Sequence, residues 1–462
     1  MKGSHTAVLA EWVAGLRHQD LPAAQRSWVK RVLLDGLGCG LYGSGLPWSA
    51  RLAGSLRRVG GGEAHVLGSG RELPPDRAAL LNGSYIQAYE LDDYHQDAGI
   101  HSAACVVPAA MAAAELAGGV TGARFLTAVA AGFEAGSRVG RCLDPTAVVR
   151  MGWHSGSVFA PLAAAAAAAV ILDLDAAQLV NAFGIAATQA SGLGAVQYGA
   201  MVKRMQHGHG AQSGLYAAML AGDGYTGIAD VFDQGYGGYC TTFVKDEPAD
   251  LDQLTDGLGD RFALMRIGLK PYSCNAGIHA TLDAVREIVR RADLAAADVE
   301  SITVRMCKAN QEHVGWPYRE PGETAAQMNL PFCVAALLVH GDVFVEQFSA
   351  DSVRSPELTE LASRVTTVHD PSFDVLGPSL RHHVEVSVAL RSGRGESHSE
   401  DYGRGSPMRP LSDEDVLQKF RKLATLGRVR EDAGELGQAV LGLEQLQDVV
   451  TLFDRLVTPA SD

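Results

Sequence analysis

The feature that most constrains the fold is an uninterrupted apolar run from residue 159 to 172, which contains seven consecutive alanines, Ala163–Ala169. Alanine has the highest helix propensity and a small side chain, so the run predicts a helix that neighbouring helices approach closely. It is shorter than the roughly 18 apolar residues that a membrane span needs. We therefore expect a buried helix at the centre of a helical domain and no membrane segment.

Helical patterns continue on both sides of this run, from about residue 7 to 260, as Ala-rich and Leu-rich segments separated by Gly or Asp. Asp175 and Gln178 have the spacing of a capping box at a helix start. The sequence Asp20-Leu21-Pro22 predicts another start, with proline in the first turn, where its missing N–H costs little. These patterns predict a compact multi-helix body.

Strand periodicity appears further along the chain, where apolar and polar residues alternate over 302–306 and again over 384–390. Residues 364–368 form a third, weaker strand pattern, and helical patterns lie between them. This region predicts an α+β domain with an antiparallel or mixed sheet. The segment 393–410 has the composition of a loop.

After this loop, Ser412–Asp415 has the pattern of a helix cap, so the chain ends in a helical tail. We expect the tail to rejoin the first helical body. The predicted fold is therefore mainly α: a large, discontinuous all-helical domain of residues 1–264 and 396–462, and a smaller α+β domain of residues 265–395.

Composition and charge exclude several classes of function. The 462 residues carry a formal charge of −14, from 39 basic and 53 acidic residues, which argues against a nucleic-acid partner. The seven cysteines are scattered without CxxC pairs, which favours reduced thiols and no zinc site. The first residues lack the apolar run of a secretory signal, so we expect a cytoplasmic location.

Nucleotide-binding and serine-hydrolase motifs receive no support from the sequence. The patterns GxxxxGK[ST] and GxSxG are absent, and the one GxGxxG match, Gly38–Gly43, follows a helical pattern rather than a strand. We therefore expect a site that works without a nucleotide cofactor.

The most titratable segment is an acidic turn, residues 90–101, which holds four carboxylates and two imidazoles in twelve residues. We expect a segment this rich in titratable groups to lie outside the core. The preceding pattern predicts a helix that starts near Asp76, which would place the carboxylates at its C-terminal end, where the helix dipole disfavours negative charge. Acidic residues at such an unfavourable position indicate a function in proton transfer or ligand binding. The alternative is a solvated acidic turn.

Two further clusters precede Ala-rich helical patterns. His154 lies at a predicted helix start, where the dipole favours its neutral form; it is either a donor or acceptor for chemistry or a helix-capping histidine. The stretch 203–210 is a basic turn containing Lys203, Arg204, His207 and His209. Lysine, arginine and helix-start N–H groups suit a carboxylate or phosphate, although a solvated basic turn is the alternative. Metal binding by the two histidines is less favoured because they do not share a helical face.

A last cluster begins at Lys270-Pro271-Tyr272 and continues to His279 and Asp283, which lie four residues apart on a predicted helix. The pair is either an oriented base or an ordinary exposed pair. Taken together, carboxylates, histidines and lysines suit proton abstraction next to a carboxylate, with lysines neutralising the developing enolate.

In this order the clusters resemble the family of methylcitrate dehydratases and cis-aconitate decarboxylases, MmgE/PrpD, over nearly the whole chain. The matching segments are Leu81–Gly83, Glu90–Asp93, His101, Val107–Ala110, Gly152–His154, Gln189–Gly192, Lys203–Arg204 with Gly208, Leu220–Gly227, Lys270–Tyr272, His279, Asp283–Ala284, Pro410–Ser412 and Lys419–Phe420.

The resemblance implies a helical domain with a smaller α+β lid domain, a homodimer, a small-molecule carboxylate substrate held between the domains, and no required metal or organic cofactor. The residues expected to carry out catalysis are His101, His154, Lys203 and Asp93. Those expected to bind substrate are Glu90, Asp92, Tyr94, Gln206, His207, Lys270, Tyr272 and His279.

The chain departs from the family pattern at four places. Ser102-Ala103 replaces the usual Pro-Gly after His101, and Gln206 replaces a common histidine. An arginine is missing from 275–277, and Phe332 stands where tyrosine is frequent. The lost arginine and phenol reduce anion binding and proton donation, which predicts a substrate other than methylcitrate and favours a specialised biosynthetic pathway.

The sequence is thus interpreted as a cofactor-independent lyase, in the first place a dehydratase that removes water from a hydroxy-carboxylic acid. A cis-aconitate-type decarboxylase or an epimerase of a dicarboxylate would use the same groups and is the alternative. A catalytically silent carboxylate-binding relative is the second alternative.

Overall fold

The computed structural model describes residues 3–198, 200–245, 248–319, 322–377, 380–429 and 431–457. The chain divides into two compact units, residues 1–267 with 412–462, and residues 268–411. The first unit is discontinuous, as the helical tail predicts. Both boundaries lie later in the chain than the predicted ones, because β4 (Ile267–Gly268) sits at the first boundary and the segment 396–411 belongs to the second unit.

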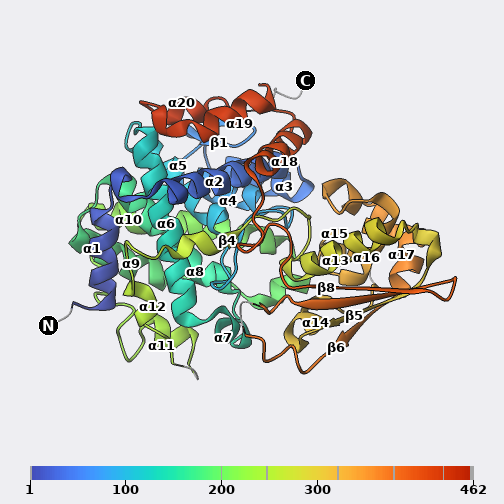
Figure 1. Ribbon diagram of the computed structural model, residues 1–462. Helices are drawn as coiled ribbons and strands as arrows, with labels where there is room; N and C mark the ends of the chain where they lie inside the picture. Colours follow the sequence, from blue (N-terminus) through green and yellow to red (C-terminus); the bar gives the residue numbers. More distant parts are fainter. Residues whose placement is uncertain are drawn as a thin grey trace. The chain divides into compact units, whose positions relative to one another are not determined.

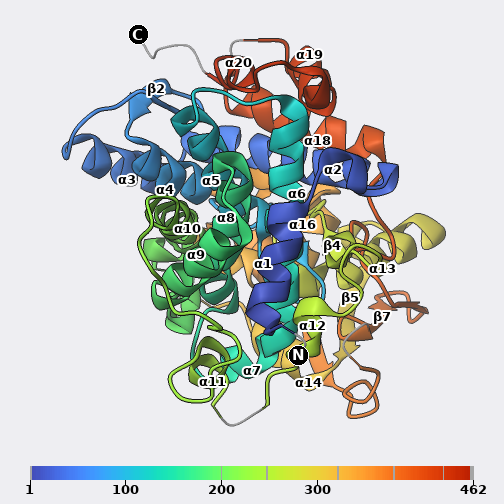
Figure 2. The ribbon, with the colours of Figure 1, turned by 90° about the vertical axis from the view of Figure 1, so that its left-hand side faces the viewer.

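The first unit is built mainly of helices (Figures 1 and 2). They are α1 (His5–Gly15), α2 (Ala23–Ser44), α3 (Pro47–Arg57), α4 (Pro75–Ile86), α5 (Ser102–Leu116), α6 (Gly122–Leu143), α7 (Pro145–Arg150), α8 (Ser155–Leu172), α9 (Ala176–Thr188), α10 (Gln206–Gly222), α11 (Tyr239–Phe243), α12 (Asp252–Thr255), α18 (Asp413–Leu426), α19 (Ala433–Leu441) and α20 (Val450–Phe453). Two of the predicted helix starts are confirmed: Asp175 and Gln178 form a capping box at α9, and Ser412 and Asp415 form one at α18. At the third, α2 begins at Ala23, so Pro22 is the N-cap residue rather than part of the first turn, and none of the described side chains caps the helix.

The alanine run lies in α8, which packs against α5, α6, α9 and α10. By length and composition alone this helix could cross a membrane, but 83% of it is buried inside the unit. The prediction of a buried, closely packed helix is confirmed, since Ala163–Ala168 are fully inaccessible to solvent.

Small residues also set the crossing of α4, α5 and α10, from which much of the candidate site projects. A Cβ atom added to Gly208 would lie 2.1 Å from the backbone oxygen of Leu80, and one added to Gly83 would lie 2.5 Å from that of Ala104. Backbone atoms cannot move aside as a flexible side chain can. Glycine at these two positions therefore lets the three helices touch.

Replacing Gly208 with alanine is expected to lower the free energy of unfolding by about 1–3 kcal/mol, because the new methyl group must push α10 away from α4. Gly54, in the exposed part of α3, is the matched control, since nothing lies within 4 Å of its added Cβ atom. Gly54→Ala should raise the free energy of unfolding by about 0.5–1 kcal/mol. Urea denaturation measures both, and equal effects of the two substitutions would contradict this packing.

The first unit is not all-helical, so that part of the prediction is wrong. Strands β1 (Ala64–Val66) and β2 (Gly70–Leu73) pair antiparallel across a short turn. These strands are too short to give a readable alternation, and their pairing depends on the turn at Gly68–Gly70.

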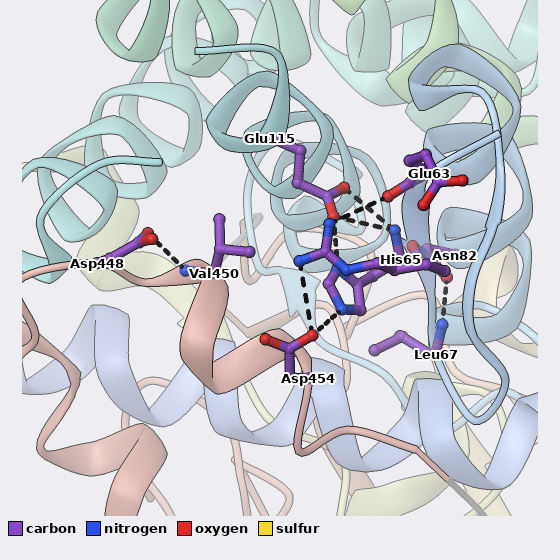
Figure 3. Close-up of polar contacts among 9 residues, drawn as sticks. Glu63, His65, Leu67, Asn82, Glu115, Asp448, Val450 and Asp454 are labelled. Atoms are coloured by element: carbon purple, nitrogen blue, oxygen red, sulfur yellow. Dashed lines mark hydrogen bonds and ion pairs between the residues drawn. The ribbon is translucent and has the colours of Figure 1, made fainter. Parts of the chain in front are cut away.

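The C-terminal segment is fastened to this unit near β1, as Figure 3 shows. The buried ring of His65 contacts the Glu115 carboxylate through Nδ1 and the Asp454 carboxylate through Nε2, the latter at 2.8 Å. The Gly68 N–H donates to the backbone oxygen of Leu456 at 2.9 Å. This C-terminal tie, His65 with Asp454, holds the last helices on the first unit.

The second unit contains one four-stranded mixed sheet of order β6-β5-β7-β8 and the helices that cover it (Figure 1). Its strands are β5 (Val299–Met306), β6 (Val365–His369), β7 (Val384–Leu390) and β8 (Gly395–Glu400); its helices are α13 (Ala276–Ala292), α14 (Lys308–Val314), α15 (Glu323–Gln327), α16 (Leu330–His340) and α17 (Pro356–Ser363). Strand β6 runs parallel to β5, and the other pairs are antiparallel. The three predicted strands and the mixed sheet are confirmed.

Strand β8 falls in the segment that the sequence predicts as a loop, and this part of the prediction is wrong. Its six residues, Gly-Glu-Ser-His-Ser-Glu, contain no apolar side chain and alternate only between exposed and partly buried positions. As an edge strand it pairs only with β7. Edge strands are often polar, so the apolar alternation that signals a strand was missing.

Candidate functional site

The acidic turn follows α4 directly, as predicted, but it is buried rather than solvated. Glu90 is 4% exposed, and Asp92 and Asp93 are 0% exposed. The expectation that so many acids could not occupy a core position is wrong, because each carboxylate has a partner that compensates for the loss of water. Glu90 also has a left-handed backbone conformation, φ 54°, which is uncommon for a residue with a side chain.

The Glu90 carboxylate is held by two cations that lie 113 and 114 residues further along the chain. Lys203 and Arg204 lie in the one-turn helix η3 (Met201–Met205) that leads into α10. The Lys203 ammonium contacts Glu90 Oε1, and the Arg204 guanidinium donates to the same oxygen at 2.7 Å. All three side chains are buried, so the solvated basic turn is excluded. The two cations form a carboxylate-binding pair that Glu90 occupies.

Asp92 and Asp93 point to different partners at the start of α5. His101 Nδ1 lies 3.0 Å from Asp92 Oδ2, so Asp92 orients that ring. Asp93 accepts the backbone N–H groups of Ser102 and Ala103 at 2.7 and 2.9 Å, and so caps α5. Burial, together with the charge of Asp92, raises the pKa of Asp93 to about 7. Both of its oxygens already bind the helix, which gives Asp93 a structural duty besides any catalytic one.

His154 is the residue before α8, where the sequence places it. Its Nδ1 atom lies 2.9 Å from the Ser157 hydroxyl, which donates to Gln206 Oε1 at 2.9 Å. Removal from water, with a smaller contribution from the Lys203 charge, lowers the pKa of His154 to about 3. This shift favours the neutral form that the sequence predicts, and burial rather than the helix dipole is its main cause.

His207 lies between the other two imidazoles. Its ring centroid is 5.0 Å from that of His101 and 5.6 Å from that of His154. It is fully buried, and neither ring nitrogen has a hydrogen-bond partner among the described residues. Gly156 makes room for it, because an added Cβ atom would lie 2.4 Å from His207 Nε2. A buried imidazole without partners costs stability, so this ring is a candidate for contact with a ligand.

Burial lowers the pKa of His207 well below its ordinary 6.5, which gives a pH-dependent stability. Below that pH the unfolded chain binds a proton that the folded His207 does not, so the stability falls as the pH falls. The wild type should lose stability relative to His207→Gln as the pH falls. The difference in unfolding free energy between the two proteins should change in favour of the variant by about 1.4 kcal/mol for each pH unit below about 6. Urea denaturation at pH 7, 6 and 5 measures this difference; a difference that stays constant with pH would contradict a neutral buried His207. The raised pKa of Asp93 makes stability rise as the pH falls, but this effect is the same in both proteins and cancels in the difference.

The candidates of the second unit form their own buried cluster. Lys270 and Tyr272 are each 2% exposed, and the Tyr272 hydroxyl donates to Asp283 at 2.5 Å. His279 Nε2 lies 3.2 Å from the backbone oxygen of Cys274, and its ring lies 5.3 Å from that of Tyr272. His279 and Asp283 are both buried, so the ordinary exposed pair is excluded. Asp283 also accepts the Arg404 N–H and thereby fixes the Tyr272 hydroxyl.

Each unit thus gathers part of the predicted set. The first unit brings together Glu90, Asp92, Asp93, His101, His154, Lys203, Gln206 and His207. The second holds Lys270, Tyr272 and His279. Tyr94 is buried in β3 (Tyr94–His95). Within the described parts of the chain, no group of three or more His, Cys, Asp or Glu residues could hold a metal ion.

Sequence reasoning named Arg204 in the basic turn but did not include it among the expected site residues, and it missed Ser157. Lys203 and Arg204 are neighbours in the short helix η3, and both contact Glu90. Adjacent residues of a helix usually point in different directions, so the sequence gives no signal that both cations meet one carboxylate. Ser157 lies three residues after His154, a spacing that puts both on one face of the first turn of α8. That spacing was the available signal.

Comparison with known proteins identifies the family. The MmgE/PrpD N-terminal domain model matches residues 7–251, and the MmgE/PrpD C-terminal domain model matches residues 272–443. The chain is 37% identical over 471 residues to the cis-aconitate decarboxylase-like protein oryM of Aspergillus oryzae, covering 98% of this chain and 97% of that protein.

Two further relatives extend the comparison. A cis-aconitate decarboxylase of Aspergillus terreus is 33% identical over 480 residues, covering 99% of this chain and 97% of the relative. The cis-aconitate decarboxylase of Mus musculus is 26% identical over 476 residues, covering 100% and 95%. The two domain models span most of the chain, and the chain therefore belongs to the MmgE/PrpD family.

Proposed function

We propose that the protein is a cofactor-independent carbon–carbon lyase that decarboxylates an unsaturated polycarboxylate of the cis-aconitate class. The observation that carries this proposal is the likeness, over at least 97% of both chains, to relatives named as cis-aconitate decarboxylases or decarboxylase-like. It favours decarboxylation, which the sequence analysis holds as the alternative, over dehydration.

The buried groups suit this chemistry. Breaking the bond to a carboxylate on the carbon next to the double bond releases CO2, and the electron pair moves through the double bond toward a second carboxylate. A proton then adds to carbon, so the reaction takes up one proton. Lys203 and Arg204 would bind a retained carboxylate in place of Glu90 and stabilise the charge that develops there. His101, oriented by Asp92, would deliver the proton.

The neutral histidines complete the proposed site. His154, whose pKa is lowered to about 3, offers a ring without charge at neutral pH. A neutral imidazole can donate one hydrogen bond and accept another, which suits it to orienting a substrate carboxylate or relaying a proton. The substrate-binding role expected of Lys270, Tyr272 and His279 stays a prediction. The homodimer and the cytoplasmic location stay predictions.

Proton NMR of the purified protein with EDTA, in deuterated water, tests the proposal against its rivals. The substrates are cis-aconitate, citrate, methylcitrate and several β-hydroxy acids. Conversion of cis-aconitate to itaconate, with deuterium on the newly protonated carbon, is the expected result. A new olefinic signal from a hydroxy acid would instead identify a dehydratase, and deuterium exchange without net conversion an epimerase. Binding without turnover over the whole panel would identify a catalytically silent relative.

A further inference from the structure

A buried lysine near the C-terminus contacts the acidic turn from 328 residues away along the chain. Lys419 lies in α18, which packs on α2. Its ammonium group donates to the backbone oxygen of Leu91 at 2.6 Å and pairs with Asp35 Oδ1 of α2, also at 2.6 Å. The side chains of Lys419 and Asp35 are 5% and 0% exposed.

The carbonyl that Lys419 binds belongs to the residue between the two carboxylates of the candidate site. Glu90 precedes Leu91 and holds Lys203 and Arg204, while Asp92 follows it and orients His101. Glu90 has the left-handed backbone conformation, φ 54°. Such a conformation persists in a residue with a side chain only where its surroundings fix it, and a charged donor on the next carbonyl does so.

We propose that Lys419 is a positioning residue of this site: by holding the Leu91 carbonyl, it sets the positions of the Glu90 and Asp92 carboxylates. Asp35 in turn neutralises the buried ammonium group and aims it. Lys419 touches none of the reacting groups itself. Its kinetic consequence rests on the proposed function, whereas its structural consequence, the orientation of His101, does not.

Lys419 could act only by attaching the C-terminal helices to the first unit. Breaking the C-terminal tie is the control for this alternative. His65 and Asp454 fasten the same C-terminal segment to the first unit, and neither contacts the acidic turn among the contacts shown in Figure 3. If α18 needed only to be attached, loss of either fastening would have similar results. If Lys419 positions the turn, only its loss will alter the site.

Four variants separate these cases. Lys419→Met removes the cation that pairs with the buried Asp35 carboxylate, and loss of one partner of a buried ion pair can by itself prevent folding. The double variant Asp35→Asn with Lys419→Met removes both charges and still lacks the donor to Leu91. Lys419→Arg keeps a cation and N–H donors, and Asp454→Asn breaks the C-terminal tie alone.

The first readout needs no substrate. In protein labelled with ¹⁵N-histidine, the His101 ring signals, assigned by their loss in His101→Asn, report the hydrogen bond to Asp92. We expect them to shift in the double variant and to match the wild type in Asp454→Asn. A folded double variant whose His101 signals equal those of the wild type would overturn the proposal, whatever the protein's substrate.

The second readout is kcat/KM with cis-aconitate, compared at a temperature where thermal melting shows every variant folded. The double variant should lose roughly 10- to 100-fold, Lys419→Arg should lose less, and Asp454→Asn should be unchanged. An equal loss in Asp454→Asn would overturn the proposal. If the wild type fails to convert cis-aconitate, the proposed function fails, and the His101 signals alone decide the role of Lys419.

Discussion

Replacing Lys203 with methionine should lower kcat/KM for cis-aconitate by a factor of about 10² to 10³ while the protein stays folded. The Glu90 carboxylate contacts both the buried Lys203 ammonium group and the Arg204 guanidinium. A substrate carboxylate would take the place of the Glu90 carboxylate. Methionine keeps the length and the apolar stem but cannot carry charge. Because Arg204 still contacts Glu90 at 2.7 Å, the buried carboxylate keeps a partner and the fold should survive.

Steady-state kinetics together with thermal unfolding measure this result. Lys245→Met is the matched control, since Lys245 is an exposed lysine whose loss should change neither activity nor stability noticeably. Near-wild-type kinetics of a folded Lys203→Met protein would remove Lys203 from the proposed site.

Replacing Asp92 with asparagine is the second large expected effect, a fall in kcat of about 10² to 10⁴ with a smaller change in KM. The Asp92 carboxylate accepts from His101 Nδ1 at 3.0 Å and thereby fixes both the ring and its tautomer. An asparagine amide can present its N–H₂ group instead, and losses of this size follow when a carboxylate that orients a catalytic histidine is neutralised.

Asp97 provides the control within the same acidic turn. Its carboxylate pairs with Arg266 at 2.8 Å, whereas the carboxylate that contacts His101 is that of Asp92. Asp97→Asn therefore removes one carboxylate charge from the turn while leaving His101 with its partner. We expect its kcat to stay close to that of the wild type. A comparable fall in kcat for both variants would show that the charge of the turn, and not the orientation of His101, is what matters.

The sequence predicted the elements whose patterns are local. The alternation over 384–390 matches β7 residue for residue, and the capping boxes at Asp175 and Ser412 begin helices where expected. Strand β8 escaped prediction because a polar edge strand has no apolar alternation. In the same way, the short β1–β2 pair depends on a turn rather than on a pattern.

The residues of the candidate site were predicted better than their surroundings. Resemblance to a family selected Glu90, His101, His154 and Lys203, but nothing local showed that the acids would be buried. Their burial depends on partners far away in sequence: Lys203 is 113 residues from Glu90, and Lys419 is 328 residues from Leu91. Contacts between residues so far apart in the sequence form only when the chain folds. No repeating pattern in a single sequence predicts them.

The most direct test of the central claim is to measure CO2 and itaconate together during incubation of cis-aconitate with the wild type and with Lys203→Met. We expect one CO2 for each itaconate formed by the wild type, without added metal or cofactor, and little of either product with the variant. No CO2 from the wild type, or equal amounts from the two proteins, would contradict it.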